Sequence, residues 1–157
     1  MEIERKFFIK EMPNLSGVVP VRYERYYLRI EPDFEERVQK VGGVYEREIK
    51  SRKSELERTS GKTLITEEEF DALKPQAQSA IVRDSYLLSN NPEISIKFYH
   101  GRYEGLVRAE VEFDSVEEAR GFVPPSWMGR EITDGPLGRD SQLLGLSEEE
   151  FKYLLKL

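Results

Sequence analysis

Charged side chains occupy every second position, 2, 4 and 6, at the start of the chain. If residues 2–9 form a strand, Glu2, Glu4 and Lys6 share one face, and mostly hydrophobic side chains occupy the other. One interpretation is a solvated strand face. The other is a binding surface, because two carboxylates about 7 Å apart on a strand, followed by an amine, suit a divalent cation beside a phosphate group. The pattern alone leaves both interpretations open.

Seven further segments have strand composition and end at turn residues: 22–31, 35–41, 44–52, 56–64, 81–88, 93–99 and 106–113. Gly42 and Gly43 separate two of them and predict a hairpin. Thr66 with Glu69 forms a capping box, so a short helix is predicted from Thr66 to Pro75, with two more over 115–120 and 147–157. Eight strands can close into a barrel without free edges. We therefore predict a single α+β domain over residues 1–157, an eight-stranded antiparallel β-barrel with flanking helices.

The charged faces of these strands predict the character of the barrel's interior. If the hydrophobic faces pack under the helices, the charged faces turn inward and line a tunnel with Glu2, Glu4, Lys6, Arg37, Glu48, Lys50, Arg58, Arg83, Lys97, Arg108, Glu110 and Glu112. Such an interior cannot be dry, because unpaired buried charge is too costly. We expect it to hold water, metal ions and a highly charged anion.

Composition excludes several classes of function. The net charge of −6 is spread along the chain without a basic stripe, so a nucleic-acid partner is not expected. The chain has no cysteine, which excludes disulfides, thiolate zinc sites and a thiol nucleophile. No hydrophobic run has membrane-spanning length, and the N-terminus does not look like a signal peptide. These features predict a soluble cytoplasmic protein without a membrane partner, and they leave a homodimer open.

Ordered landmarks along nearly the whole chain resemble one protein family. The segment Glu2-Ile3-Glu4-Arg5-Lys6 is similar to the ExExK signature of the CYTH, or triphosphate tunnel metalloenzyme, superfamily. The resemblance continues at compatible spacing through Arg37, Gly42-Gly43, Ile49-Lys50-Ser51, Arg58, residues 109–113 and the Pro-Pro-x-Trp segment within residues 123–133. ExExK alone is a weak pattern, but the ordered set is specific.

The resemblance implies an eight-stranded tunnel that binds a triphosphate-containing small molecule with Mg²⁺ or Mn²⁺. Family members hydrolyse inorganic, thiamine or nucleoside triphosphates, and some cyclise ATP. By position, the implied metal ligands are Glu2, Glu4, Glu110 and Glu112. The implied catalytic residues are Glu4, Lys6 and Arg58. The implied substrate-binding residues are Lys6, Arg37, Lys50, Arg58, Lys62, Arg83, Lys97 and Arg108.

The chain departs from the family pattern at six positions, which are Gln39, Ser60, Lys62, Ser85, Ser95 and Lys97. Lys62 and Lys97 stand where acids are usual, which leaves fewer metal ligands. Three functions therefore stay open: metal-dependent hydrolysis of a triphosphate, non-catalytic binding of polyphosphate or a nucleotide, and an adenylate cyclase of the lyase type, for which no residue indicates an adenine site. The sequence predicts neither the particular triphosphate nor the number of metal ions.

Overall fold

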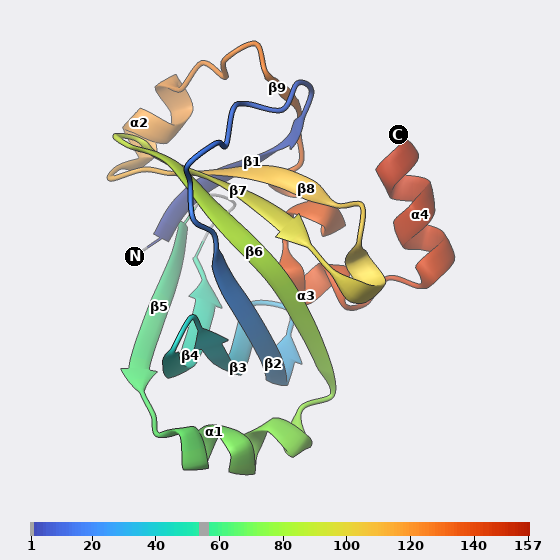
Figure 1. Cartoon of the computed structure of the whole chain (residues 1–157). Coiled ribbons are helices and arrows are strands. Elements are labelled where there is room, and N and C mark those ends of the chain that lie inside the picture. Colours follow the sequence, from blue (N-terminus) through green and yellow to red (C-terminus); the bar gives the residue numbers. More distant parts are fainter. Residues whose placement is uncertain (1, 54–56) are drawn as a thin grey trace.

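An antiparallel sheet of nine strands curls around a central tunnel in the computed structural model (Figure 1). The structure describes residues 2–53 and 57–157, with Glu57 and Arg58 described by their backbone alone. The strands are β1 (Glu2–Ile9), β2 (Val21–Glu31), β3 (Phe34–Val41), β4 (Val44–Arg52), β5 (Glu57–Leu64), β6 (Ser79–Asn90), β7 (Glu93–Tyr99), β8 (Val107–Glu112) and β9 (Met128–Glu131).

Strand β1 joins the two ends of the sheet. The strand order is β5-β4-β3-β2-β6-β7-β8-β1-β9, and β5 also pairs with β1 over two residue pairs, Glu2 with Arg58 and Ile3 with Glu57. The short strand β9 pairs farther along β1, at Phe7 and Ile9. The eight predicted strands thus form the tunnel. Because β1 and β5 pair over only two residue pairs, the sheet is not strictly closed. The prediction of eight strands missed β9, because four residues are too few to show an alternating pattern.

Local signals in the sequence set the turns and helix starts as predicted. Gly42 has a φ of +59° in the β3–β4 turn, a conformation that glycine adopts without strain. Helix α1 (Glu67–Leu73) begins at the Thr66 capping box, and η1 (Lys74–Gln76) follows it. Helix α2 (Val116–Gly121) is capped by Ser115, and α4 (Glu148–Lys156) has its own capping box at Ser147.

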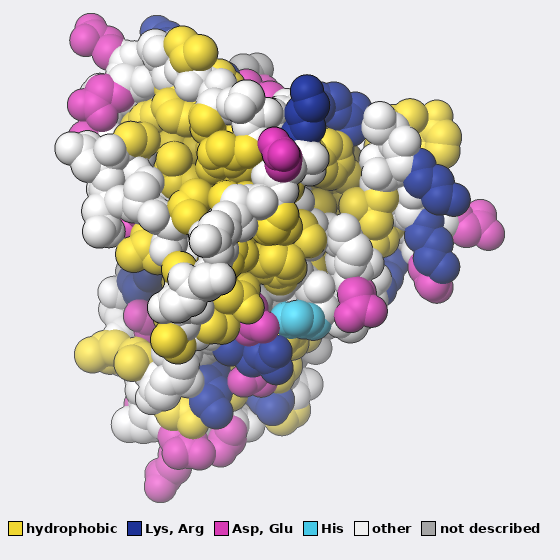
Figure 2. Space-filling view, turned by 45° about the horizontal axis from the view of Figure 1, so that its top comes forward, with side chains coloured by type: hydrophobic (Ala, Val, Ile, Leu, Met, Phe, Trp, Pro, Cys, Tyr) yellow, Lys and Arg dark blue, Asp and Glu magenta, His cyan; other side chains and the backbone are white. Residues whose placement is uncertain are grey.

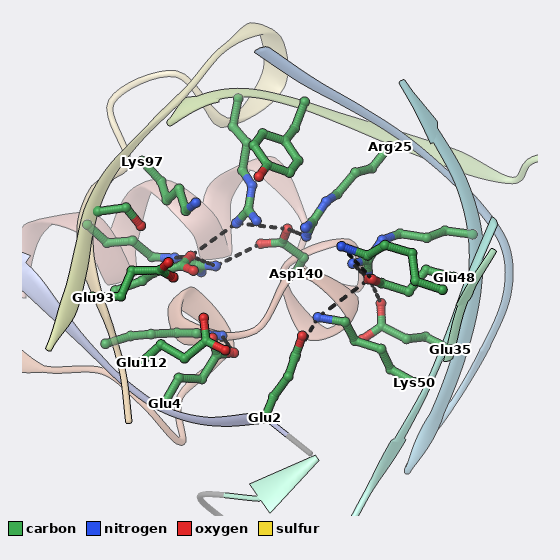
Figure 3. A pocket seen from close by; sticks show the side chains of 18 residues that line it. Glu2, Glu4, Arg25, Glu35, Glu48, Lys50, Glu93, Lys97, Glu112 and Asp140 are labelled. Carbon is green, nitrogen blue, oxygen red and sulfur yellow. Dashed lines mark hydrogen bonds and ion pairs between the residues drawn. The ribbon is translucent and has the colours of Figure 1, made fainter. Parts of the chain in front are cut away.

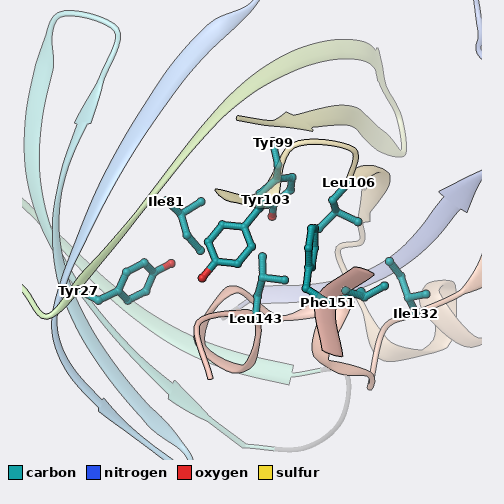
Figure 4. Close-up of a cluster of buried hydrophobic side chains, with 9 residues drawn as sticks. Tyr27, Ile81, Tyr99, Tyr103, Leu106, Ile132, Leu143 and Phe151 are labelled. Atoms are coloured by element: carbon teal, nitrogen blue, oxygen red, sulfur yellow. The ribbon is translucent and has the colours of Figure 1, made fainter. Parts of the chain in front are cut away.

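A hydrophobic cluster fills one end of the tunnel (Figure 4). It combines side chains from β2, β6 and β7 with others from η2 (Gly101–Tyr103), η3 (Pro136–Gly138), α3 (Asp140–Leu143), α4 and two connecting loops. These side chains are Tyr27, Ile81, Tyr99, Tyr103, Leu106, Ile132, Leu137, Leu143 and Phe151. Gly138 permits this packing, because a Cβ there would stand 1.8 Å from the Ile132 carbonyl oxygen. The C-terminal segment therefore seals this end and holds α3 against it.

A second hydrophobic cluster lies on the outside of the sheet. Phe7, Ile96 and Val111 are buried there beneath α2. The Arg5 side chain also points outward and links α2 to β9, donating to the Ala119 carbonyl at 2.8 Å and to the Glu131 carboxylate at 2.7 Å. Figure 2 shows hydrophobic side chains gathered on this face of the molecule. Hydrophobic faces outward and charged faces inward are the arrangement that the strand patterns predict.

Candidate functional site

The tunnel encloses a cavity of about 290 Å³ whose wall is almost entirely charged. Among the described residues, eight acidic and eight basic side chains line it, and Tyr23 and Ser95 complete the wall (Figure 3). The acids are Glu2, Glu4, Glu35, Glu48, Glu93, Glu110, Glu112 and Asp140, and the bases are Lys6, Arg25, Arg37, Lys50, Lys62, Arg83, Lys97 and Arg108. We call this space the tunnel cavity.

The structure brings the sequence-predicted site residues together on this one wall. All of them with described side chains line the tunnel cavity: Glu2, Glu4, Lys6, Arg37, Lys50, Lys62, Arg83, Lys97, Arg108, Glu110 and Glu112. Arg58 pairs through its backbone with Glu2, and its side chain lies outside the described part of the chain. The roles assigned to these residues stay predictions.

Sequence reasoning missed five wall residues. Glu35 and Glu93 share the alternation of Arg37 and Lys97 on their strands, so extending each pattern to the strand end would have found them. Tyr23 and Arg25 alternate in the same way on β2, a strand on which the sequence analysis named no wall residue. Asp140 carried no such signal, because it belongs to the short helix α3, which was not predicted.

Acidic side chains lie at the mouth of the tunnel cavity and basic side chains at its deep end. Strand register aligns Glu112 with Glu93 on one side and with Glu4 on the other, and Glu93 and Glu112 are exposed to solvent. Four residues deeper along their strands, Lys97 and Arg108 are paired and buried, with Arg108 only 1% exposed. We call Glu4, Glu93 and Glu112 the acidic mouth.

Mutual repulsion of carboxylates is concentrated in the acidic mouth. Partial desolvation, a hydrogen bond with Glu93 and the charges of Glu93, Glu4 and Glu2 together raise the pKa of Glu112 to about 7. A cation bound here would relieve this repulsion, and carboxylate oxygens are the ligands that hard divalent cations prefer. Among the described residues, however, no three acidic side chains are already arranged as a metal-binding group.

Three of the four predicted metal ligands form ion pairs in this structure, since Glu4 lies 3.1 Å from the Lys6 ammonium group. Glu2 accepts from Lys50 at 2.8 Å. Glu110 accepts from Arg83 at 3.1 Å and from Arg108 at 2.9 Å. Burial alone would raise the pKa of Glu110, but these arginines hold the pKa well below its usual range. Glu110 thus acts in this structure as an anchor for guanidinium groups.

Three arginines converge at the deep end of the tunnel cavity on one carboxylate, that of Asp140 (Figure 3). Arg25 lies 3.0 Å, Arg108 3.1 Å and Arg83 3.4 Å from its oxygens. The Tyr99 hydroxyl donates to it at 2.5 Å. We call Arg25, Arg83 and Arg108 the arginine cluster. It outweighs the effect of burial and holds the pKa of Asp140 well below its ordinary value.

The wall formed by β3 and β4 is a separate network of ion pairs. Arg37 donates to Glu35 at 2.7 Å, to Gln39 at 2.9 Å and to Glu48. Burial alone would raise the pKa of Glu48, but Arg37 and Lys50 lower it to about 2. Arg37 is 1% exposed and Glu48 is 2% exposed, so this network is fixed in position.

Lys97 differs from the other cations on the wall of the tunnel cavity because it forms no ion pair with any described residue. Its ammonium group donates to the Ser85 hydroxyl at 2.7 Å and lies 5.1 Å from the centre of the Tyr23 ring. Burial lowers the pKa of Lys97 to about 8. The tunnel cavity therefore contains a desolvated cation directed into the open space (Figure 3), as an anion-binding site requires.

Comparisons with known proteins agree with this architecture. An inorganic triphosphatase of Nitrosomonas europaea is 29% identical over 137 residues, which span 85% of this chain and 89% of that protein. The crystal structure of the inorganic triphosphatase NE1496 matches with a TM-score of 0.64 and 27% identity, over 91% of this chain and 93% of that one. These similarities support the assignment of this chain to the CYTH, or triphosphate tunnel metalloenzyme, superfamily.

The match to this solved structure confirms the tunnel fold that the sequence predicts. A Hippeastrum protein named as an adenylyl cyclase, with a dominant triphosphatase activity, shares the fold at a TM-score of 0.55 and 13% identity, over 77% of this chain and 83% of that one. No protein-family model matches the chain. Triphosphatases of the tunnel family are generally metal-dependent. In the part of the chain that the structure describes, no helix has the length and hydrophobicity needed to cross a membrane.

Proposed function

We propose that this CYTH protein hydrolyses the terminal phosphate of a triphosphate-containing small molecule, and that inorganic triphosphate is the substrate that its cavity fits best. The observation that carries the proposal is the convergence of eight basic side chains on one small cavity. A triphosphate carries several negative charges on a short chain, and it needs cations on several sides at once. The similarity to an inorganic triphosphatase over most of both chains supports the same substrate.

The wall offers little to a nucleotide base. Tyr23 is the only aromatic side chain among the described wall residues. Arg25, Arg83 and Lys97 place their charged groups 5.1 to 5.5 Å from the centre of its ring, so its faces are already occupied. A base needs aromatic or hydrophobic surface on which to stack. This wall therefore supports inorganic triphosphate over ATP and disfavours an adenylate cyclase.

The acidic mouth fits a divalent cation, Mg²⁺ or Mn²⁺, by the chemistry of its donors. Glu4, Glu93 and Glu112 would hold the ion, and it would neutralise the neighbouring carboxylates that, together with burial, raise the pKa of Glu112. Glu93 here replaces Glu2 and Glu110, which are bound to Lys50 and to two arginines. When bound, such an ion lowers the pKa of a coordinated water and neutralises phosphate oxygens.

The chain's own cations would bind and orient the substrate. Lys6 stands opposite Glu110 in the strand register, and its ammonium group lies 3.1 Å from Glu4. Lys6 therefore lies between the acidic mouth and the arginine cluster, where it can bind a phosphate next to a metal ion. Lys97 and Lys50 face the same space from other strands. Binding on several sides holds the anhydride bond in position and limits access of bulk water.

Phosphate release tests the proposal. Wild type is incubated with inorganic triphosphate, ATP or thiamine triphosphate, each with Mg²⁺, Mn²⁺ or a chelator. We expect the fastest release from inorganic triphosphate with a metal and little release with chelator. Glu4→Gln should abolish metal-stimulated release and keep the fold, whereas Glu117→Gln, a matched change on the exposed face of α2, should behave like wild type.

A second candidate, non-catalytic binding of polyphosphate, is favoured by one observation. Lys97 stands where the family usually has an acid, and it can neutralise phosphate without a metal. Calorimetric titration with inorganic triphosphate in the presence of chelator measures this binding directly. Tight binding without phosphate release under any metal condition would establish the second candidate instead of hydrolysis.

A further inference from the structure

Asp140 is the only acid on the wall of the tunnel cavity that comes from outside the barrel strands, within the described residues. It begins helix α3, and its carboxylate is delivered into the deep end of the tunnel cavity (Figure 3). Leu137 and Leu143 flank it and are buried in the cluster that seals the tunnel. Asp140 is 6% exposed, so its position is fixed by packing on both sides.

The carboxylate of Asp140 occupies the arginine donors that face the tunnel cavity. One oxygen accepts from Arg108 at 3.1 Å and the other from Arg25 at 3.0 Å. Arg83 lies 3.4 Å away and also donates to Glu110. A carboxylate and a phosphate compete for the same guanidinium geometry, because each presents two oxygens to a planar pair of N–H donors.

We propose that Asp140 is a resident anion that competes with the substrate's phosphate for the arginine cluster and thereby weakens binding of substrate and product alike. The inference rests on the proposed function and adds a residue that sets affinity at the same site. With Glu110 and Asp140 both ionised, the three arginines keep one unit of net positive charge. Without Asp140 they would keep two, on side chains that are buried, where a unit charge has a large effect.

Weaker binding of phosphate groups should speed product release during turnover. Hydrolysis of triphosphate leaves pyrophosphate and orthophosphate, both of which carry charges that the arginine cluster would retain. A carboxylate that returns to the arginines when phosphate leaves favours release of the product. Asp140 is therefore a positioning and affinity-setting residue, and it takes no part in the bond cleavage.

The alternative is a purely structural ion pair, and Asp140→Asn separates the two roles. Asparagine keeps the size and one acceptor oxygen but removes the charge. We expect this variant to bind inorganic triphosphate and orthophosphate about tenfold more tightly than wild type in the presence of chelator, with a steeper dependence on salt. With metal, KM should fall, inhibition by orthophosphate should strengthen about tenfold, and kcat should decrease.

Asp84→Asn is the matched control. Asp84 lies outside the tunnel cavity and pairs with Arg22 at 3.0 Å, so this variant loses the same charge on the outer surface. Its affinity for both anions should equal that of wild type. Unchanged or weaker anion binding by a folded Asp140→Asn protein would overturn the proposal and leave Asp140 a structural residue.

If Asp140→Asn is unstable, thermal unfolding with and without orthophosphate still tests the proposal. If the arginines are left without their carboxylate, orthophosphate should raise the melting temperature of Asp140→Asn more than that of wild type. A variant that folds neither alone nor with orthophosphate also overturns the proposal, since it assigns Asp140 to the fold. Binding is measured without turnover, so tighter binding by the variant would stand even if wild type hydrolysed no triphosphate.

Discussion

The ammonium group of Lys97 donates to the hydroxyl of Ser85 at 2.7 Å, across the pairing of β7 with β6. Both residues depart from the pattern that the family usually has. The hydroxyl orients the lysine without neutralising it, whereas an acid in place of Ser85 would neutralise it. The pair therefore presents a positive charge to the tunnel cavity.

Binding of an anion without metal should weaken as pH rises through about 8. Burial lowers the pKa of Lys97 to about 8, and a bound anion favours its protonated form. Above that pKa, binding must take up a proton, so affinity should fall about tenfold between pH 7 and pH 9. Lys97→Arg stays charged and should lose this part of the pH dependence. Calorimetry of inorganic triphosphate with chelator makes the comparison, and identical profiles for the two proteins would exclude Lys97 as the titrating group.

Glu112→Gln should impair the response to metal while the protein stays folded. The substitution removes one charge from the acidic mouth, where Glu112 and Glu93 share a hydrogen bond. We expect the metal concentration for half-maximal turnover to rise at least about tenfold. Phosphate release over a series of Mn²⁺ concentrations measures this. Asp114→Asn, an exposed acid two residues farther on, is the control, and an equal loss in both variants would contradict the assignment.

In the double variant Lys62→Glu with Lys97→Asp, bound metal should take over from the two lysines in neutralising the substrate's charge. The variant places acids at two wall positions where the family usually has them. We expect weaker binding of inorganic triphosphate with chelator and faster metal-dependent hydrolysis. Paired titration and phosphate-release assays on both proteins give the answer. Equal binding without metal would show that neither lysine contacts the ligand.

Gly138→Ala should destabilise the seal at the deep end. A Cβ at this position would stand 1.8 Å from the Ile132 carbonyl oxygen, so the backbone must move. We expect the free energy of unfolding to fall by about 3 kcal/mol. Urea unfolding measures it. Gly135→Ala is the control in the same loop, since its Cβ would lie 3.8 Å from that oxygen, and the effect should stay within about 0.5 kcal/mol.

The strands were predictable because their signal is local. β1, β4 and β7 have the bounds that alternation and turn residues indicate. Strand alternation assigns Glu4, Lys50 and Arg108 to the inner face of the sheet, and their side chains do line the tunnel cavity. Because successive side chains of a strand point to opposite faces, knowing which face is buried fixes the direction of every side chain on that strand. The capping boxes at Thr66 and Ser147 are equally local, because donor and acceptor stand three residues apart.

The partners of the wall residues were not predictable, because they depend on tertiary structure. Alternation places Glu110 on the wall, but it cannot show that Arg83 and Arg108 take its oxygens. Asp140 follows an arginine in a polar segment and looks like a surface acid. Its helix is four residues long, lacks a side-chain cap and is held by burial of Leu143. No short-range pattern contains that information.

The position of β1 at the seam has a consequence for how the protein matures. Glu4 pairs with Glu112, more than a hundred residues away, and Phe7 pairs with Glu131 farther still. Contacts this distant form late, since long loops must first be closed. On the ribosome, the β3–β4 hairpin can form early, but β1 must wait for β8 before Glu4 meets its neighbours. A nascent chain released before β8 therefore has no acidic mouth, and the whole site is acquired only near the end of synthesis.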